Sequence, residues 1–320
     1  MLYKAASKRR AILWLRLSLS LALVAILSAL LIRPDFWQTL ISELISLPLH
    51  IVGSLFLLSL VMRALQTIVL KYALSAFELR IRMRDCAQLL GLKGIYNMGI
   101  SGGGIAAQLA QSRITLGIKT GQFIGATLLQ AGMFISSLLF ILGSVLLIIG
   151  AAPFRNQSLL GVVCFVCASA AAGLVISGLW PNERIRGIRA LAFLHHLRAD
   201  ALNQGVLRPI IFRIYLYSIG IHVARSVRFT ILLSFMAAQV SLEFGVTAVL
   251  VADVVAQLPV TPAGLGTREL ALGYFGEAMT LFDVFLAAAI IDRTVAICFN
   301  IAHGLLAFLT LSFASQAPKL

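Results

Sequence analysis

Long apolar stretches alternate with short polar connections over nearly the whole chain. A membrane-spanning helix needs about 20 consecutive, mostly apolar residues. By this measure we predict about six full transmembrane helices, at roughly 11–32, 49–74, 119–150, 158–180, 209–236 and 280–313. The first follows a basic stretch, as a signal peptide does. Its long apolar run without a small-residue cleavage site favours an anchor helix that is retained.

Two further apolar stretches, 85–112 and 245–272, are interrupted by helix breakers. In each, about 10–12 apolar residues, half of what a span needs, come before the break and a second short helix. We predict two re-entrant helical hairpins whose tips approach each other, since irregular backbone at membrane depth must meet protein or a water-filled cavity. Two buried amphipathic surface loops are the alternative. The breakers are Gly102, Gly103, Gly104, Pro259, Pro262, Gly264 and Gly266.

The two broken stretches resemble each other at an offset of 160 residues, which is half the chain. This alignment pairs Asn97 with Gln257, Ser101 with Thr261 and Gly104 with Gly264. Each stretch follows a predicted helix that carries a mid-span arginine, Arg63 or Arg225. Because these two helices would cross the membrane in opposite directions, the pattern predicts an inverted repeat, which in transporters points to a binding site near the midplane.

The predicted fold class is therefore an all-α polytopic membrane protein with an inverted repeat. Residues 1–320 form a single membrane domain. Its predicted parts are an N-terminal anchor helix and outer loop (1–48), a first repeat core (49–112), connecting helices with a cytoplasmic basic loop (113–208), and a second repeat (209–320).

Composition and charge agree with a membrane protein. Hydrophobic residues make up 60% of the chain and charged residues 12%, which leaves too few polar groups to cover a water-exposed surface. The net charge of +14 is distributed unevenly: with a cytoplasmic N-terminus, sixteen Lys and Arg lie on that side against two outside, and eight lie at membrane depth. This predicts cytoplasmic termini and a cytoplasmic 181–208 loop, and no nucleic-acid partner.

Charges at membrane depth mark the candidate site, because each costs about 2.5–3.5 kcal/mol to insert. The basic members are Arg63, Arg225, Arg228, Arg268 and Arg293, and the acidic ones are Asp253, Glu269 and Asp292. We predict that the arginines, with Asn97, bind an anion, since guanidinium groups match phosphate oxygens. The acids would serve as charge partners or in proton coupling. The alternative is that the arginine–acid pairs only stabilise the packing of the helices and bind no ligand.

Two of these residues receive specific roles. We expect Glu269 to pair with one of the membrane arginines and to hold it in place. Arg268 would be left to meet phosphate, because it follows the break at the start of a half-helix, where backbone N–H groups favour anions.

No catalytic, cofactor or metal site is predicted. His195 and His196 are adjacent on a basic loop and point about 100° apart on a helix, which indicates a solvated face. Cys164 and Cys167 lie in an apolar run without a redox or metal-binding setting. The chain also has no Walker-type phosphate loop.

The segment Pro259-Val-Thr-Pro-Ala-Gly-Leu-Gly-Thr-Arg-Glu269 resembles the signature of the lysylphosphatidylglycerol synthase transmembrane-region family, also called flippase-like proteins. Asn97 with its following glycines resembles the first-half counterpart, and Arg293 a late-helix arginine. The first half departs from the pattern, because it lacks a proline and an acidic residue near 99–104. The resemblance implies an inner-membrane domain that moves or presents a lipid. Multidomain relatives translocate aminoacylated phosphatidylglycerol made by a soluble synthase domain, which these 320 residues do not contain.

These observations lead to one main hypothesis, a flippase or transporter that binds an anionic, phosphate-bearing lipid, either a phospholipid or a polyprenyl-phosphate-linked one. It would not be an enzyme. The alternative is a membrane-embedded enzyme or accessory subunit of lipid or glycolipid biosynthesis. A third reading is a scaffold, with a glycosyltransferase or lipid-modifying enzyme as partner.

Overall fold

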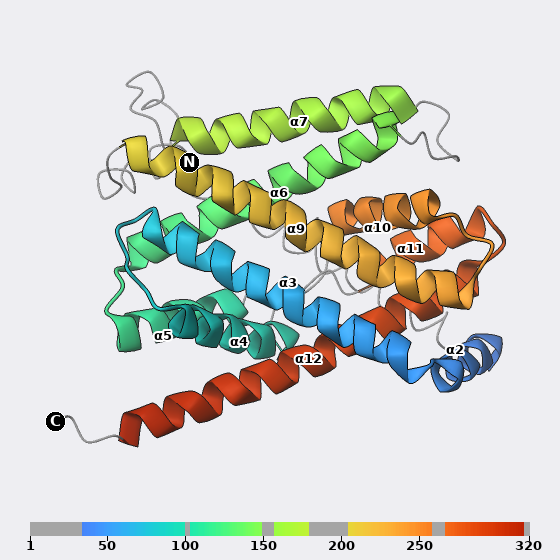
Figure 1. Cartoon of the computed structure of the whole chain (residues 1–320), viewed down its shortest axis with the longest axis horizontal. Coiled ribbons are helices and arrows are strands. Elements are labelled where there is room, and N and C mark those ends of the chain that lie inside the picture. Colours follow the sequence, from blue (N-terminus) through green and yellow to red (C-terminus); the bar gives the residue numbers. More distant parts are fainter. Residues whose placement is uncertain (1–33, 100–102, 149–156, 179–203, 258–265, 317–320) are drawn as a thin grey trace, which may run out of the picture.

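The computed structural model describes residues 34–99, 103–148, 157–178, 204–257 and 266–316, and every regular element in these ranges is an α-helix (Figure 1). The helices are α2 (Pro34–Ser46), α3 (Leu49–Ser75), α4 (Met83–Gly99), α5 (Gly103–Leu116), α6 (Thr120–Ile148), α7 (Gln157–Gly178), α9 (Gln204–Met236), α10 (Leu242–Ala256), α11 (Thr267–Glu277) and α12 (Phe282–Gln316). Four of them, α3, α6, α9 and α12, are long and apolar enough to cross a membrane. The chain is thus a multi-pass helical membrane protein.

Five of the predicted spans correspond to helices with nearly the predicted bounds: α3, α6, α7, α9 and α12. Helix α7 has 22 residues, and its described side chains form a shorter apolar stretch, Leu159–Ala170, that packs along α6. The predicted anchor helix 11–32 lies outside the described residues.

One helix occurs where the sequence predicted part of the outer loop. Helix α2 buries Phe36 and Leu40, one turn apart, in the core shared with α9, α10 and α12, and leaves Ile41 and Ile45 exposed. Pro34 suits the first helical position because it has no N–H to leave unsatisfied. The prediction failed because α2 has 13 residues, too few for a span.

Both broken stretches form pairs of short helices. Helices α4 and α5 pack side by side, and Gln108 of α5 donates a hydrogen bond to the backbone oxygen of Leu89 in α4 (3.1 Å). Helices α10 and α11 form the second pair. Of the predicted breakers, Gly103 and Gly104 begin α5, and Gly266 precedes α11 with a positive φ of 85° that favours glycine. Gly102, Pro259, Pro262 and Gly264 lie outside the described residues, as do both hairpin tips.

The two helix pairs begin at opposite ends of α12. Helix α4 runs antiparallel to α12, with Gln88 bonded to Thr310 and Gly94 close to Asn300. Helix α10 starts near the other end, where Phe244 contacts Phe285, and ends beside Asp292. The pairs therefore converge on the middle of α12 from opposite directions (Figure 1).

The two halves of the chain are arranged as two matching units. The first unit consists of α3, α4, α5 and α6, and the second consists of α9, α10, α11 and α12. Helices α3 and α9 lie antiparallel along their length, as shown by contacts of Ser59 with Arg228 and of Tyr72 with Arg213. Helices α6 and α12 also run in opposite directions (Figure 1). Helices α3, α4, α5 and α6 correspond in order to α9, α10, α11 and α12. Each contact that a helix makes within or between these two sets has a counterpart made by the corresponding helix. This is the packing that an inverted repeat predicts.

Candidate functional site

A cavity of about 790 Å³ lies between the two units. Its walls come from α3, α6, α9 and α12, and from the ends of both helix pairs that are nearest their breaks. Lys93 and Asn97 of α4 line it from one pair, and Asp253 of α10 and Arg268 of α11 from the other. Although the tips themselves are outside the described residues, the segments next to them reach one cavity.

The cavity is rich in positive charge. Six of its lining side chains are cationic: Arg63, Lys93, Arg225, Arg228, Arg268 and Arg293. Two carboxylates line it, Asp253 and Asp292, and a third, that of Glu269, contacts Arg293. The lining also includes amide side chains and apolar side chains such as Phe134 and Phe299.

Three arginines and two aspartates form a continuous arginine–aspartate chain, in the order Arg225, Asp253, Arg268, Asp292, Arg228. Asp253 accepts from Arg225 (3.0 Å) and from Arg268 (2.9 Å). Asp292 accepts two bonds from Arg228 (2.7 and 3.0 Å) and one from Arg268 (3.2 Å). Each aspartate is 1% exposed. The chain joins α9, α10, α11 and α12, and each buried charge in it has at least one opposite partner, as burial requires.

Glu269 fixes the start of α11. One of its carboxylate oxygens accepts the backbone N–H of Gly266 (2.8 Å), which would otherwise be unsatisfied at the helix N-terminus. The other accepts from Arg293 of α12. Glu269 therefore pairs with one of the membrane arginines and positions it, in agreement with the pairing expected from the sequence.

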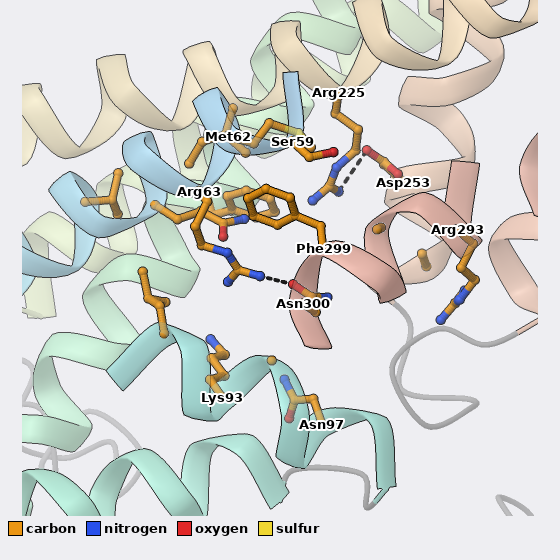
Figure 2. Close-up of a pocket in the computed structure, with 18 of the residues that line it drawn as sticks. Ser59, Met62, Arg63, Lys93, Asn97, Arg225, Asp253, Arg293, Phe299 and Asn300 are labelled. Carbon is orange, nitrogen blue, oxygen red and sulfur yellow. Dashed lines mark hydrogen bonds and ion pairs between the residues drawn. The ribbon is translucent and has the colours of Figure 1, made fainter. Parts of the chain in front are cut away.

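The opposite side of the cavity has cations without acids. Arg63 of α3 donates to the side-chain oxygen of Asn300 in α12, and the Lys93 side chain points toward the same space from α4 (Figure 2). Within the described residues, neither Arg63 nor Lys93 forms an ion pair. Asn97 lies one turn beyond Lys93, and its side-chain oxygen accepts the Gly104 N–H across the break (2.9 Å). We call Arg63, Lys93, Asn97 and Asn300 the acid-free pole.

The structure brings together the charged residues and the asparagine that the sequence singled out. The eight that line the cavity are Arg63, Asn97, Arg225, Arg228, Asp253, Arg268, Asp292 and Arg293, and Glu269 lies directly behind Arg293. The expectation that Arg268 is left unpaired is wrong, because it bridges two aspartates. Its Nη2 atom is buried without a hydrogen-bond partner among the described residues, so a contact from Arg268 to a ligand stays a prediction.

Sequence analysis missed Lys93 as a site residue. The sequence could have identified it, because a lysine inside an apolar half-span is as costly to bury in a membrane as an arginine and therefore also indicates a functional site. Its position four residues before Asn97 also places the two on one helix face. Asn300 was also left out of the predicted site, although it lies two helical turns after Arg293 on the same face of α12.

The remaining polar candidates do not form a metal or redox centre in the described part of the chain. No three His, Cys, Asp or Glu side chains are arranged there so that they could hold a metal ion. Cys164 is buried, Cys167 is exposed, and both are free thiols. His222 is fully buried and its Nε2 lies 3.0 Å from the backbone oxygen of Phe134. His195 and His196 lie outside the described residues.

Comparison with known proteins identifies the family. No curated protein matches the sequence. The family model for the lysylphosphatidylglycerol synthase TM region matches residues 14–304, which include all of the cavity-lining residues. That match agrees with the resemblance of the 259–269 segment. The chain therefore belongs to the lysylphosphatidylglycerol synthase transmembrane-region family.

Proposed function

We propose that the protein binds a phosphate-bearing lipid in this cavity and translocates it across the bacterial inner membrane. The observation that carries the proposal is the cavity's excess of cations over carboxylates at the meeting point of the two units. Guanidinium and ammonium groups bind phosphate oxygens strongly, and a partly closed, apolar-walled site strengthens that attraction.

The arrangement of the two units supports translocation rather than binding alone. Two antiparallel units with interrupted helices around a central site form the architecture in which rocking of one unit against the other exposes the site alternately to the two sides. Here both helix pairs end at the cavity, so a shift of either pair would change access to it. We propose that α4–α5 and α10–α11 are the re-entrant gates of this movement.

Charge at the two ends of the molecule supports an orientation. The ends of α3 and α5 and the starts of α6 and α9 lie at one end (Figure 1, left). That end carries Lys71, Arg80, Arg82, Arg84, Arg113, Lys119 and Arg208. At the other end, α2 and the start of α12 carry Asp35, Glu43 and Asp283, and their described residues include no Lys or Arg. By the positive-inside rule, we place the basic end and both termini in the cytoplasm.

We propose no covalent chemistry at this site. Carboxylates are among the groups that commonly act as a general base or nucleophile. The two lining carboxylates, of Asp253 and Asp292, are each held by two arginines. Their role in the proposal is to keep the arginines in place.

Reconstitution in liposomes tests the proposal. Purified protein is placed in vesicles that contain a head-group-labelled phospholipid, and access of a membrane-impermeant quencher to the label is followed over time. We expect label to change leaflets without chemical change in wild type and only slowly in the Arg63→Gln variant. Arg213→Gln removes an exposed arginine outside the cavity and serves as the control. Absence of movement for every anionic lipid tested would contradict the proposal, as would chemical conversion of the lipid.

A further inference from the structure

The charge balance of the cavity restricts which head group fits. Six cationic side chains line it, and three carboxylates reach those cations, those of Asp253, Asp292 and Glu269. Among the described residues the site therefore has a net excess of three positive charges. Residues 100–102 and 258–265, which lie outside the described residues, contain no charged residue and so do not change this balance.

The excess charge is concentrated at the acid-free pole. Every arginine of the second unit that lines the cavity contacts an acid: Arg225, Arg228, Arg268 and Arg293. Arg63 is held only by the amide of Asn300, and Lys93 has neither a hydrogen bond nor an ion pair within the described residues. Gln66 and Gln130, which also line the cavity, add neutral amide donors. This pole offers two full positive charges and several N–H donors to a ligand.

An ammonium group has no comparable place in the cavity. Each of the three carboxylates already receives two partners: Asp253 and Asp292 each meet two arginines, and Glu269 meets Arg293 and the Gly266 N–H. A head-group ammonium would therefore lie among unbalanced cations with no carboxylate left to receive it. Repulsion between like charges is strong at short distance when water is largely excluded.

We propose that the site selects a head group with at least two negative charges and no ammonium, such as a phosphate monoester or a diphosphate, whose oxygens bind Arg63 and Lys93. A phosphate monoester carries about −1.5 to −2 at neutral pH, which matches the two cations of the pole. This inference rests on the proposed function for the lipid as ligand. It excludes an aminoacylated phospholipid as the preferred ligand, because that head group carries an ammonium.

Direct binding measurements on purified protein in detergent test the selectivity. The probes are dioctanoyl phosphatidate, dioctanoyl phosphatidylglycerol, dioctanoyl lysyl-phosphatidylglycerol and inorganic pyrophosphate, each titrated by isothermal calorimetry. We expect phosphatidate to bind most tightly of the three lipids and lysyl-phosphatidylglycerol most weakly. Equal or tighter binding of lysyl-phosphatidylglycerol would overturn the proposal.

Variants of the pole localise the site. We expect Lys93→Gln and Arg63→Gln each to weaken phosphatidate binding about 10- to 100-fold, the loss of one charged hydrogen bond. Lys93→Arg, which keeps the charge, should retain most of the affinity, and this shows that Lys93→Gln acts through charge rather than misfolding. The control Arg213→Gln removes the same charge from an exposed position outside the cavity and should bind as wild type does. Unchanged affinity in both Gln variants would refute the site.

Pyrophosphate separates this inference from the proposed function. If it competes with phosphatidate but binds more weakly, the ligand is a lipid head group and both ideas stand. If it binds as tightly as phosphatidate and no lipid moves in vesicles, the doubly anionic site is correct and lipid translocation is not. If phosphatidate moves and binds no better than lysyl-phosphatidylglycerol, translocation stands and the selectivity is wrong.

Discussion

At the scale of single residues, the site is organised by its carboxylates. Asp292 is the most heavily bonded of them, because it accepts two bonds from Arg228 and one from Arg268 while almost fully buried. Asp253 joins Arg268 to Arg225 in the same way. The carboxylates thus hold four helices in the geometry that surrounds the cavity.

Replacing Asp292 by Asn should lower the free energy of unfolding by about 3–5 kcal/mol, the usual cost of removing one partner from a buried ion pair. The amide keeps the size of the side chain and removes its charge, so two buried arginines lose an acid. Glu277→Gln makes the same change at an exposed position and should cost almost nothing. Thermal unfolding in detergent measures both, and equal stability of the two variants would show that the chain of pairs does not stabilise the fold.

The charged residues of the site other than Lys93 could be predicted from sequence, but most of their pairings could not. A charge at membrane depth is costly enough that a chain retains it only where a partner exists, which is why Arg225, Asp253 and Arg268 stood out. Which acid each arginine contacts depends on how α9, α10, α11 and α12 cross. These crossing positions cannot be read from a single sequence. Arg268 was therefore placed correctly in the site and wrongly left unpaired.

At the scale of helices, α9 carries a row of buried polar atoms that have no hydrogen-bond partner among the described residues. Ser218, His222, Ser226 and Thr230 recur every fourth residue on one face, and each has a buried side-chain atom with no hydrogen-bond partner among the described residues. Elsewhere, hydroxyls in the long helices often bond to the carbonyl one turn earlier, as Ser59 and Thr67 do. The hydroxyls of the α9 row contribute no such bond.

We expect Ser226→Ala to change the free energy of unfolding by less than about 0.5 kcal/mol, because it removes a hydroxyl that has no hydrogen-bond partner within the described residues. Ser59→Ala is the matched comparison on α3. It removes an acceptor of the buried Arg228 guanidinium (2.8 Å) and should cost about 1–3 kcal/mol. Chemical denaturation of both variants measures the difference. A large loss for Ser226→Ala would mean that ordered water binds the α9 row.

Close contact between α4 and α12 depends on glycine. Helix α4 crosses α12 where Gly91 faces Gly304, and a Cβ on Gly304 would lie 2.4 Å from Ile95 and 2.9 Å from the Gly91 oxygen. Gly304→Ala should therefore force the helices apart and lower the free energy of unfolding by about 1–3 kcal/mol. Gly53→Ala on α3 has nothing within 4 Å of the added Cβ and should raise stability by about 0.5–1 kcal/mol. Thermal unfolding of the two glycine variants measures whether stability falls in Gly304→Ala and rises in Gly53→Ala. Equal changes in stability would argue against a close α4–α12 crossing.

Helices could be predicted from the sequence where a long apolar run or a clear helix breaker marked them. Long apolar runs gave α3, α6, α7, α9 and α12, and glycine and proline breaks separated α4 from α5 and α10 from α11. Helix α2 was missed because a short helix that buries two side chains against α12 has the composition of an amphipathic loop. Its burial depends on a surface that only the folded α12 supplies.

At the scale of the whole molecule, the repeat seen in the sequence is expressed in the packing. The two units place α3 and α9 antiparallel and bring both helix pairs to one cavity. The units are not equivalent in charge, however. The second contributes the paired arginines and all three acids, and the first contributes Arg63 and Lys93 without an acid. An offset of 160 residues predicted the symmetry, while this division of charge became visible only in the structure.

The proposed orientation of the molecule rests on the basic residues at one of its ends and can be checked with single cysteines. In a background where Cys86, Cys164, Cys167 and Cys298 are replaced, Ile45→Cys places a thiol on the exposed face of α2, where Ile45 is 80% exposed. Met83→Cys places one at the start of α4, at the basic end, where Met83 is 39% exposed. Because the cytoplasmic side of a membrane protein retains Lys and Arg, we expect a membrane-impermeant maleimide added to intact cells to label residue 45 and to reach residue 83 only after permeabilisation. A cysteine at position 195, a residue of the predicted basic loop that lies outside the described residues, should behave like residue 83. Labelling of 83 or 195 from outside, with 45 protected, would reverse the orientation and with it the side from which each helix pair enters the membrane.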